Sequence, residues 1–257
     1  VDLWVSDNAT ALTTYGEINT WDVSLITDMS ELFRDKTTFN DDIGNWDVSS
    51  VTIMEMMFNV ASSFNQSLSS WDVSNVTMMN GMFRFASIFN QDLSNWDVSS
   101  VVLMDQMFMG ALSFNGDISG WDVSSVTNIG GMFSSTNSFN GDISTWDMSN
   151  VINMTYMFYN SDIFNGDISS WNVSSVTNMQ ATFEGASSFN QDISSWDISS
   201  VTLMDYMFLN TDALSEENQC AIHTSFSSNA NWPYDWSGLC DVVQNTYVPD
   251  DNFEQAL

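Results

Sequence analysis

Hydrophobic positions recur along this chain with a constant step of 25 residues. Between successive tryptophans the consensus reads W-D-V-S-S-V-T-x-M-x-x-M-F-x-x-A-x-x-F-N-x-D-I-S-x. A fixed period without insertions is typical of a solenoid, in which each repeat forms one coil stacked on its neighbour. The recurring tryptophans are Trp21, Trp46, Trp71, Trp96, Trp121, Trp146, Trp171 and Trp196.

Two local patterns within each repeat predict one short helix and one short strand. The two methionines, the first phenylalanine and the alanine fall near i, i+3, i+4 and i+7, as on one face of a helix, and the Ser or Thr before them suits its N-cap. The F-N-x-D-I-S-x-W-D-V segment alternates apolar with small polar residues, which predicts a strand of a narrow parallel sheet. We therefore expect a leucine-rich-repeat-like solenoid of eight coils with a cap at each end.

The boundaries of the repeat divide the chain into four parts. Residues 1–20 hold a partial repeat that would form the N-terminal cap, and residues 21–210 form the eight-coil array. The pattern fails after that, and residues 211–240 form an aromatic-rich segment suited to cover the last coil, since a solenoid must cover its terminal apolar face. Residues 241–257 are predicted to be a linker toward a further module.

Charge narrows the classes of partner. The chain carries 33 acidic and only three basic residues, for a formal net charge of −30. Nucleic acid is excluded as a partner because phosphate binding depends on clustered lysine and arginine. The sequence contains no apolar run of the length that crosses a bilayer, so no membrane insertion is expected. Cations, basic proteins, neutral glycans and self-association remain possible, and the acidity fits a secreted or cell-surface location.

The only two cysteines, Cys220 and Cys240, lie in the predicted C-terminal cap. In a secreted protein, they would most simply form one disulfide, and a buried reduced pair is the alternative. The single histidine, His223, stands near Cys220, but a Cys–His nucleophile would need a free thiol. Because no other catalytic motif is present, we expect no enzymatic activity.

Polar residues also recur in columns. An asparagine follows the second phenylalanine in seven of the eight repeats, and we expect it to satisfy turn backbone groups from coil to coil. Thirteen aspartates stand in two further columns, one after tryptophan and one before isoleucine. Stacked carboxylates repel one another, so each must accept local backbone N–H groups in an Asx turn or share a cation such as Ca²⁺. We favour turns for the Trp-Asp column.

The Asp-Ile-Ser column is the best candidate binding surface, since the aspartate and serine flank an inward isoleucine and should face solvent. It could bind Ca²⁺, a basic partner or a glycan. Whether it holds a metal is left open by the sequence. The candidate residues are Asp42, Asp92, Asp117, Asp142, Asp167 and Asp192, with Ser94, Ser119, Ser144, Ser169 and Ser194.

The motifs W-D-V-S-S-V-T, M-x-x-M-F and F-N-x-D-I-S resemble those of the BspA-like leucine-rich-repeat surface proteins, over residues 20 to about 210. The resemblance implies a surface-exposed solenoid used in adhesion or protein interaction, and it supplies no catalytic residues. The expected function is a non-enzymatic extracellular scaffold that binds a protein or glycan through an acidic Asp/Ser face. The alternative is a self-assembling unit of a surface fibre or matrix, with possible dependence on Ca²⁺.

Overall fold

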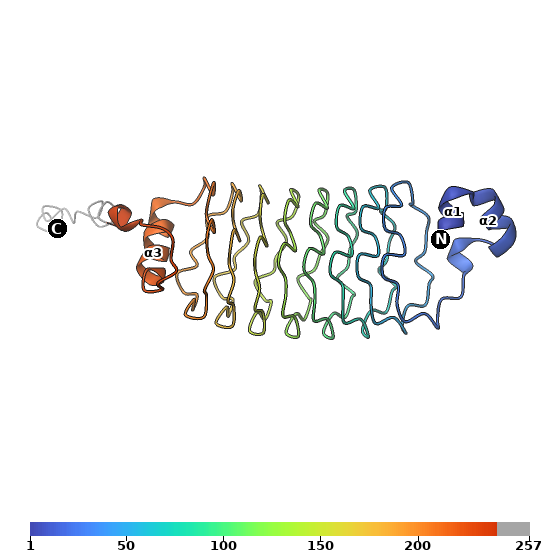
Figure 1. Cartoon of the computed structure of the whole chain (residues 1–257), viewed down its shortest axis with the longest axis horizontal. Coiled ribbons are helices and arrows are strands. Elements are labelled where there is room, and N and C mark those ends of the chain that lie inside the picture. Colours follow the sequence, from blue (N-terminus) through green and yellow to red (C-terminus); the bar gives the residue numbers. More distant parts are fainter. Residues whose placement is uncertain (241–257) are drawn as a thin grey trace, which may run out of the picture.

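The protein is an elongated stack of coils with a helical segment at each end (Figure 1). This computed structural model describes residues 1–240, so the predicted linker at 241–257 lies outside the described residues. At the N-terminal end lie α1 (Asp2–Ser6), α2 (Asn8–Tyr15) and the 3₁₀ helix η1 (Ile18–Thr20). At the C-terminal end lies α3 (Glu216–Phe226). Among the helices of the described residues, none is long and apolar enough to cross a bilayer.

The stack is held together by a narrow ladder of backbone hydrogen bonds. Seven isolated parallel bridges connect one position of each repeat, from Asp28 to Leu203. Between residues 54 and 61, alternate N–H groups donate either to the next coil or to the carbonyl three residues earlier. Thus the Met56 N–H donates to Asn80 (2.9 Å), whereas the Met57 N–H donates to Met54 (3.3 Å). This segment is therefore a run of overlapping β-turns, whose backbone groups are paired both within and between coils.

The predicted helix and strand of each repeat are wrong in detail. Between residues 21 and 215 the structure contains no helix, and the M-x-x-M-F segment forms turns instead. The parallel pairing lies in this segment, not in F-N-x-D-I-S-x-W-D-V. A helix of about two turns is too short to be stable alone, whereas the β-turns let alternate N–H groups pair with the next coil. The expected helix cap is also replaced: the Thr52 hydroxyl donates to the Thr27 carbonyl of the preceding coil (3.1 Å).

The turns require left-handed backbone at two positions of each repeat, and most of these carry a residue other than glycine. Met56 and Val60 illustrate the two positions, with φ of 51° and 62°. A side chain with a Cβ costs roughly 1–2 kcal/mol in this region, and a β-branched one is least tolerated. Val60 is therefore the most strained residue of its column, where other repeats carry Gly110, Asn160 and Asn210.

We expect Val60→Asn to raise the free energy of unfolding by about 1 kcal/mol, because asparagine adopts this conformation more readily. Urea denaturation at constant slope measures the change. Val102→Asn is the control, since Val102 is a valine at the surface that is not among the positive-φ residues, and it should give no gain. A Val60→Asn protein no more stable than the wild type would contradict the assignment of strain.

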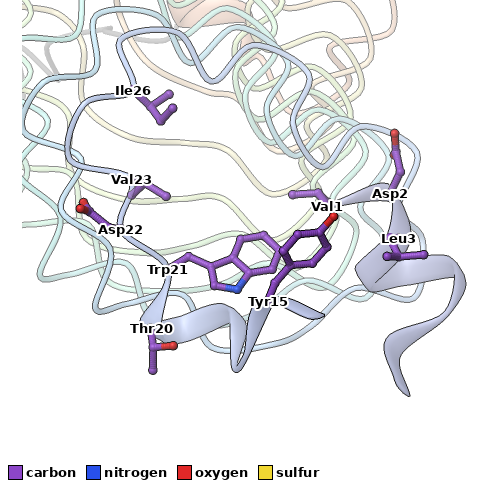
Figure 2. A pocket seen from close by; sticks show the side chains of 9 residues that line it. All are labelled: Val1, Asp2, Leu3, Tyr15, Thr20, Trp21, Asp22, Val23 and Ile26. Carbon is purple, nitrogen blue, oxygen red and sulfur yellow. The ribbon is translucent and has the colours of Figure 1, made fainter. Parts of the chain in front are cut away.

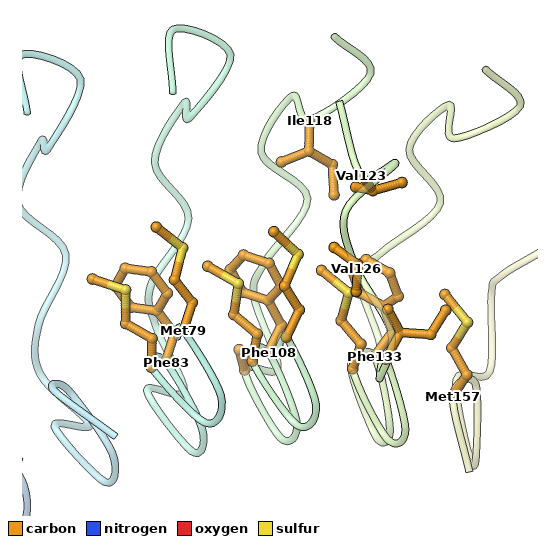
Figure 3. Close-up of a cluster of buried hydrophobic side chains, with 14 of the residues drawn as sticks. Met79, Phe83, Phe108, Ile118, Val123, Val126, Phe133 and Met157 are labelled. Atoms are coloured by element: carbon orange, nitrogen blue, oxygen red, sulfur yellow. The ribbon is translucent and has the colours of Figure 1, made fainter. Parts of the chain in front are cut away.

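The interior is built from columns of identical side chains (Figure 3). Phe83, Phe108 and Phe133 stack on one another with ring centroids 5.7 and 5.9 Å apart and nearly parallel planes. The methionines of the repeat are buried beside them, as the sequence predicts. Because like residues lie over like, the whole array shares one continuous core.

The tryptophans form a second column that is both apolar and hydrogen-bonded. Trp96 and Trp121 stack at 6.4 Å with an interplanar angle of 1°. The Trp96 indole N–H donates to the carbonyl of Leu68 in the preceding coil (3.0 Å). The same bond recurs for each tryptophan from position 46 to position 196. The asparagine column is confirmed in its predicted structural role, since each asparagine oxygen accepts from the backbone N–H one coil further on.

The C-terminal cap replaces the missing next coil. The Ser215 N–H continues the asparagine column by donating to Asn190 (2.9 Å), and the Tyr234 hydroxyl accepts from the Phe208 N–H (2.8 Å). Ile222 and Phe226 of α3 are fully buried. The predicted disulfide between Cys220 and Cys240 is present and ties α3 to the aromatic segment that follows it.

Candidate functional site

The aspartates of the Asp-Ile-Ser column are solvent-exposed, but each is engaged with its own repeat. Asp117 accepts from the Ser119 N–H (3.0 Å) and hydroxyl (2.8 Å), which is an Asx turn. The same turn forms at the other aspartates of the column, with Gly44 in place of serine after Asp42. Their turn bonds run to Ser94, Ser119, Ser144, Ser169 and Ser194. The structure therefore aligns these residues in a row but gives each a local structural role.

The Trp-Asp column has the same geometry, which agrees with the predicted turns. The Ser49 hydroxyl and N–H both donate to one oxygen of Asp47 (2.6 and 3.1 Å). Asn172 replaces aspartate in one repeat and still accepts from the Ser174 hydroxyl (2.7 Å). The turn thus needs an oxygen acceptor and not a charge.

The turns lower the carboxyl pKa. The hydroxyl of Ser49, and then its N–H, stabilises the ionised form of Asp47, and Asp97 and Asp122 gain the same two bonds from the serine two residues on. These hydrogen bonds outweigh the repulsion between stacked carboxylates, which opposes the shift for Asp47 and Asp97. They therefore supply the compensation that the stacking of like charges demands.

This gives an expected pH dependence. A group whose pKa is lower in the folded state stabilises it above the unfolded pKa of about 3.9, and the stabilisation is lost as the pH falls through the folded value. We therefore expect Tm to decrease as the pH is lowered below about 4. Asp97→Asn and Asp122→Asn keep the turn, as Asn172 does, but remove the charge, so they should lower Tm slightly at pH 7 and reduce this acid loss. An unchanged acid limb in the double variant, measured by calorimetry, would contradict the assignment.

The possible Ca²⁺ site gains no ligand set from the described part of the chain. Within residues 1–240, no three His, Cys, Asp or Glu side chains are grouped so that they could hold a metal ion. The carboxylates of each column stand one to a repeat, with one oxygen turned to the local serine.

A groove on another face of the stack was not predicted. It lies across three neighbouring coils and has a volume of about 440 Å³. Its floor is the buried pair Gly130 and Gly131. Asp105 lies on one side and Tyr156 and Tyr159 on the other. The remaining lining residues are Gln106, Met109, Asn128, Ser134, Asn153 and Thr155.

The groove exists because one surface position of the repeat changes from coil to coil. Asp105, Gly130 and Thr155 are equivalent residues of successive repeats, as are Gln106, Gly131 and Tyr156. Two adjacent glycines between bulkier neighbours leave space one coil wide. The sequence signal was therefore the Gly130-Gly131 doublet, but only the inter-coil ladder shows that this position faces outward.

A second concave surface lies at the N-terminal end, where Tyr15 and Trp21 stand between the helices and the first coil (Figure 2). Its volume is about 690 Å³. The buried Trp21 indole N–H has no hydrogen-bond partner in the described part of the chain, because no earlier coil offers the carbonyl that later tryptophans use. This pocket is thus an end effect of the stack.

The geometry gives no support to a Cys–His nucleophile. Both cysteines are in the disulfide, so neither is a free thiol. His223 instead accepts at Nδ1 from the Trp232 indole N–H (3.1 Å), which packs the cap.

These features define a repeat protein, a solenoid of stacked 25-residue coils with an outer face that varies along the stack. The chain belongs to the family described as "Mycoplasma protein of unknown function, DUF285", whose model matches residues 4–115, 74–162 and 141–231.

Two solved structures are similar at low identity. The leucine-rich repeat protein TpLRR of T. pallidum is 11% identical, with a TM-score of 0.37, and the match covers 80% of this chain and 79% of that one. TLR13 in its complex with ssRNA13 is 14% identical, with a TM-score of 0.34, and the match covers 66% of this chain and 24% of that one. A comparison with curated proteins gives no match.

Proposed function

We propose that this protein is a non-enzymatic interaction scaffold that acts at a cell surface or in a secreted matrix and binds a protein or a glycan. The observation that carries the proposal is the contrast between a constant interior and one variable outer face. At the position of Asp105, successive repeats carry residues of different size and charge, whereas the buried tryptophan and phenylalanine columns are invariant. Variable side chains on a rigid repeat are the usual design of a binding surface.

The extracellular location is supported by two properties. A disulfide persists most readily in an oxidising compartment, and Cys220 and Cys240 form one. A net charge of −30 opposes aggregation, and the salt of an extracellular medium screens the repulsion between its carboxylates. The resemblance of the repeat to BspA-like surface proteins agrees with both.

The test is binding of the purified protein to a panel of defined extracellular matrix proteins and purified glycans, with turnover of the glycans followed in parallel. We expect saturable binding that is weakened by substitutions on the variable face, such as Tyr156→Ala, and no release of sugar. Asp117→Asn, on the Asp-Ile-Ser column, shows whether that acidic row adds to the affinity. Saturable binding to no member of the panel, or glycan cleavage, would contradict the proposal.

The alternative, end-to-end assembly into a fibre, is favoured by the two edges of the ladder. In the described residues the Ser30 and Leu32 carbonyls of the first coil accept no hydrogen bond, and the Met204 and Tyr206 N–H groups of the last coil donate none. The edges are thus complementary. Sedimentation over a concentration series tests this: a strict monomer at high concentration removes the fibre. A Tm that decreases when EDTA is added would show that the protein, in either function, is stabilised by Ca²⁺.

A further inference from the structure

The groove over Gly130 and Gly131 contains a carboxylate that no other residue of the described chain holds. The Asp105 carboxylate is partly buried there and accepts no hydrogen bond from another residue of the described chain. It differs in this from the aspartates of the two columns, which are held by serine. None of the three basic residues of the chain lines the groove. Burial raises the pKa of Asp105 against the lowering effect of its own backbone N–H, and the negative charge of Glu55 adds a smaller upward contribution.

Aromatic faces stand opposite this carboxylate. Tyr156 and Tyr159 pack edge to face, with ring centroids 5.5 Å apart and an interplanar angle of 84°. Tyr156 is 41% exposed, although its repeat position is shared with glycine and alanine elsewhere. A carboxylate and a tyrosine face across a depression of this volume are the two elements that hold a guanidinium or ammonium group.

Two of the three amide side chains that line the groove, Asn128 and Asn153, already accept hydrogen bonds within the stack. Asn128 Oδ1 accepts from the Gly130 N–H (3.1 Å) and from Asn153 Nδ2 (2.9 Å). Asn153 Oδ1 in turn accepts from the Thr155 N–H (3.0 Å) and hydroxyl. Among the lining residues the one charged group is the Asp105 carboxylate, which bonds more strongly to a cation than to a neutral sugar hydroxyl.

We propose that this groove binds the side chain of an arginine or lysine presented by a protein partner, with Asp105 as the ion-pair acceptor and Tyr156 as the cation–π face. The inference rests on the proposed scaffold function and names the kind of partner. The overall charge of −30 would speed the approach of such a basic partner, as steering by opposite charge does.

The experiment titrates the whole protein with acetyl-Gly-Arg-Gly-amide and with its lysine and glutamine counterparts, followed by NMR shifts. We expect the arginine and lysine peptides to bind at the groove and the glutamine peptide not to bind. Asp105→Asn should weaken binding about tenfold and Tyr156→Ala about threefold. Gly131→Gln should abolish it by filling the floor. Neighbouring repeats already carry Gln106 and Tyr156 at this position with φ near that of Gly131, so the fold should accept the change.

Matched controls come from the last coil. Asp205→Asn and Tyr206→Ala change the equivalent positions outside the groove and should leave the affinity unaltered. An equal loss of affinity in the groove variants and in the last-coil variants would mean general attraction to an acidic protein and would overturn the site. Unaltered binding of the peptides to Asp105→Asn would overturn it too. Chitin or cellulose oligosaccharides that shift the groove signals independently of Asp105 would assign it to glycans instead. Peptide binding at the groove without binding to the macromolecular panel would leave this site standing and remove the proposed function.

Discussion

Phe133→Ala should lower the free energy of unfolding by about 3–5 kcal/mol, as the loss of a large buried aromatic side chain does. Phe133 is fully buried and stacks on Phe108 and Phe158 in the neighbouring coils at 5.9 and 5.7 Å. It also contacts Phe139 of its own coil at 4.0 Å. The cavity therefore interrupts both the core of one coil and the coupling between the two halves of the array.

The consequence for cooperativity separates this effect from simple destabilisation. A repeat protein is stabilised by interfaces between nearest neighbours, so a defect in the middle should let the halves unfold separately and reduce the urea slope. Phe33→Ala removes the same side chain from the first coil, where Phe58 is the only neighbour within the phenylalanine column. Phe33→Ala should therefore lower the free energy of unfolding by less than Phe133→Ala does and leave the urea slope nearly unchanged. Equal effects of the two substitutions would contradict a linear array.

Removal of the disulfide is the second large effect. The double substitution Cys220→Ser with Cys240→Ser should cost about 3 kcal/mol, since the bond closes a loop with a sequence separation of 20. The loss should be concentrated at the C-terminal end, because the cap covers Phe208 through Tyr234 and Trp236. Calorimetry with and without a reductant measures it.

The double variant supplies the control for the reductant. Reduction should lower the Tm of the wild-type protein to that of the double variant and should not change the variant itself. A wild-type Tm that is insensitive to complete reduction, verified by thiol titration, would show that the cap is held by its packing alone.

The sequence predicted which side chains are inside but not the backbone that places them there. Methionine, phenylalanine and alanine at i, i+3, i+4 and i+7 suit one helical face, but they suit a run of overlapping turns equally well. The deciding conformations are left-handed ones at positions such as Met56 and Val60, and neither residue type signals such a conformation. The helix was therefore predicted where the inter-coil ladder lies.

The candidate site shows the same division. The aspartate columns were visible in the sequence, and their turns with serine were among the predicted roles, because an Asx turn is a local structure. The groove needed Asp105, Gly131 and Tyr156, which belong to three coils and meet only once the stack is formed. Its unpaired carboxylate depends on which neighbours lie within reach, and this is a property of the packed surface.

The sequence by itself determined the period, the buried columns, the capped ends and the surplus of negative charge, since a constant step of 25 residues places like residues over like in any stack. Only the tertiary structure decided the path of each coil and the concave surface that results. The physical reason is that every second N–H in the ladder takes its acceptor from the next coil. The choice between helix and turns is therefore made by contacts between repeats and not within one.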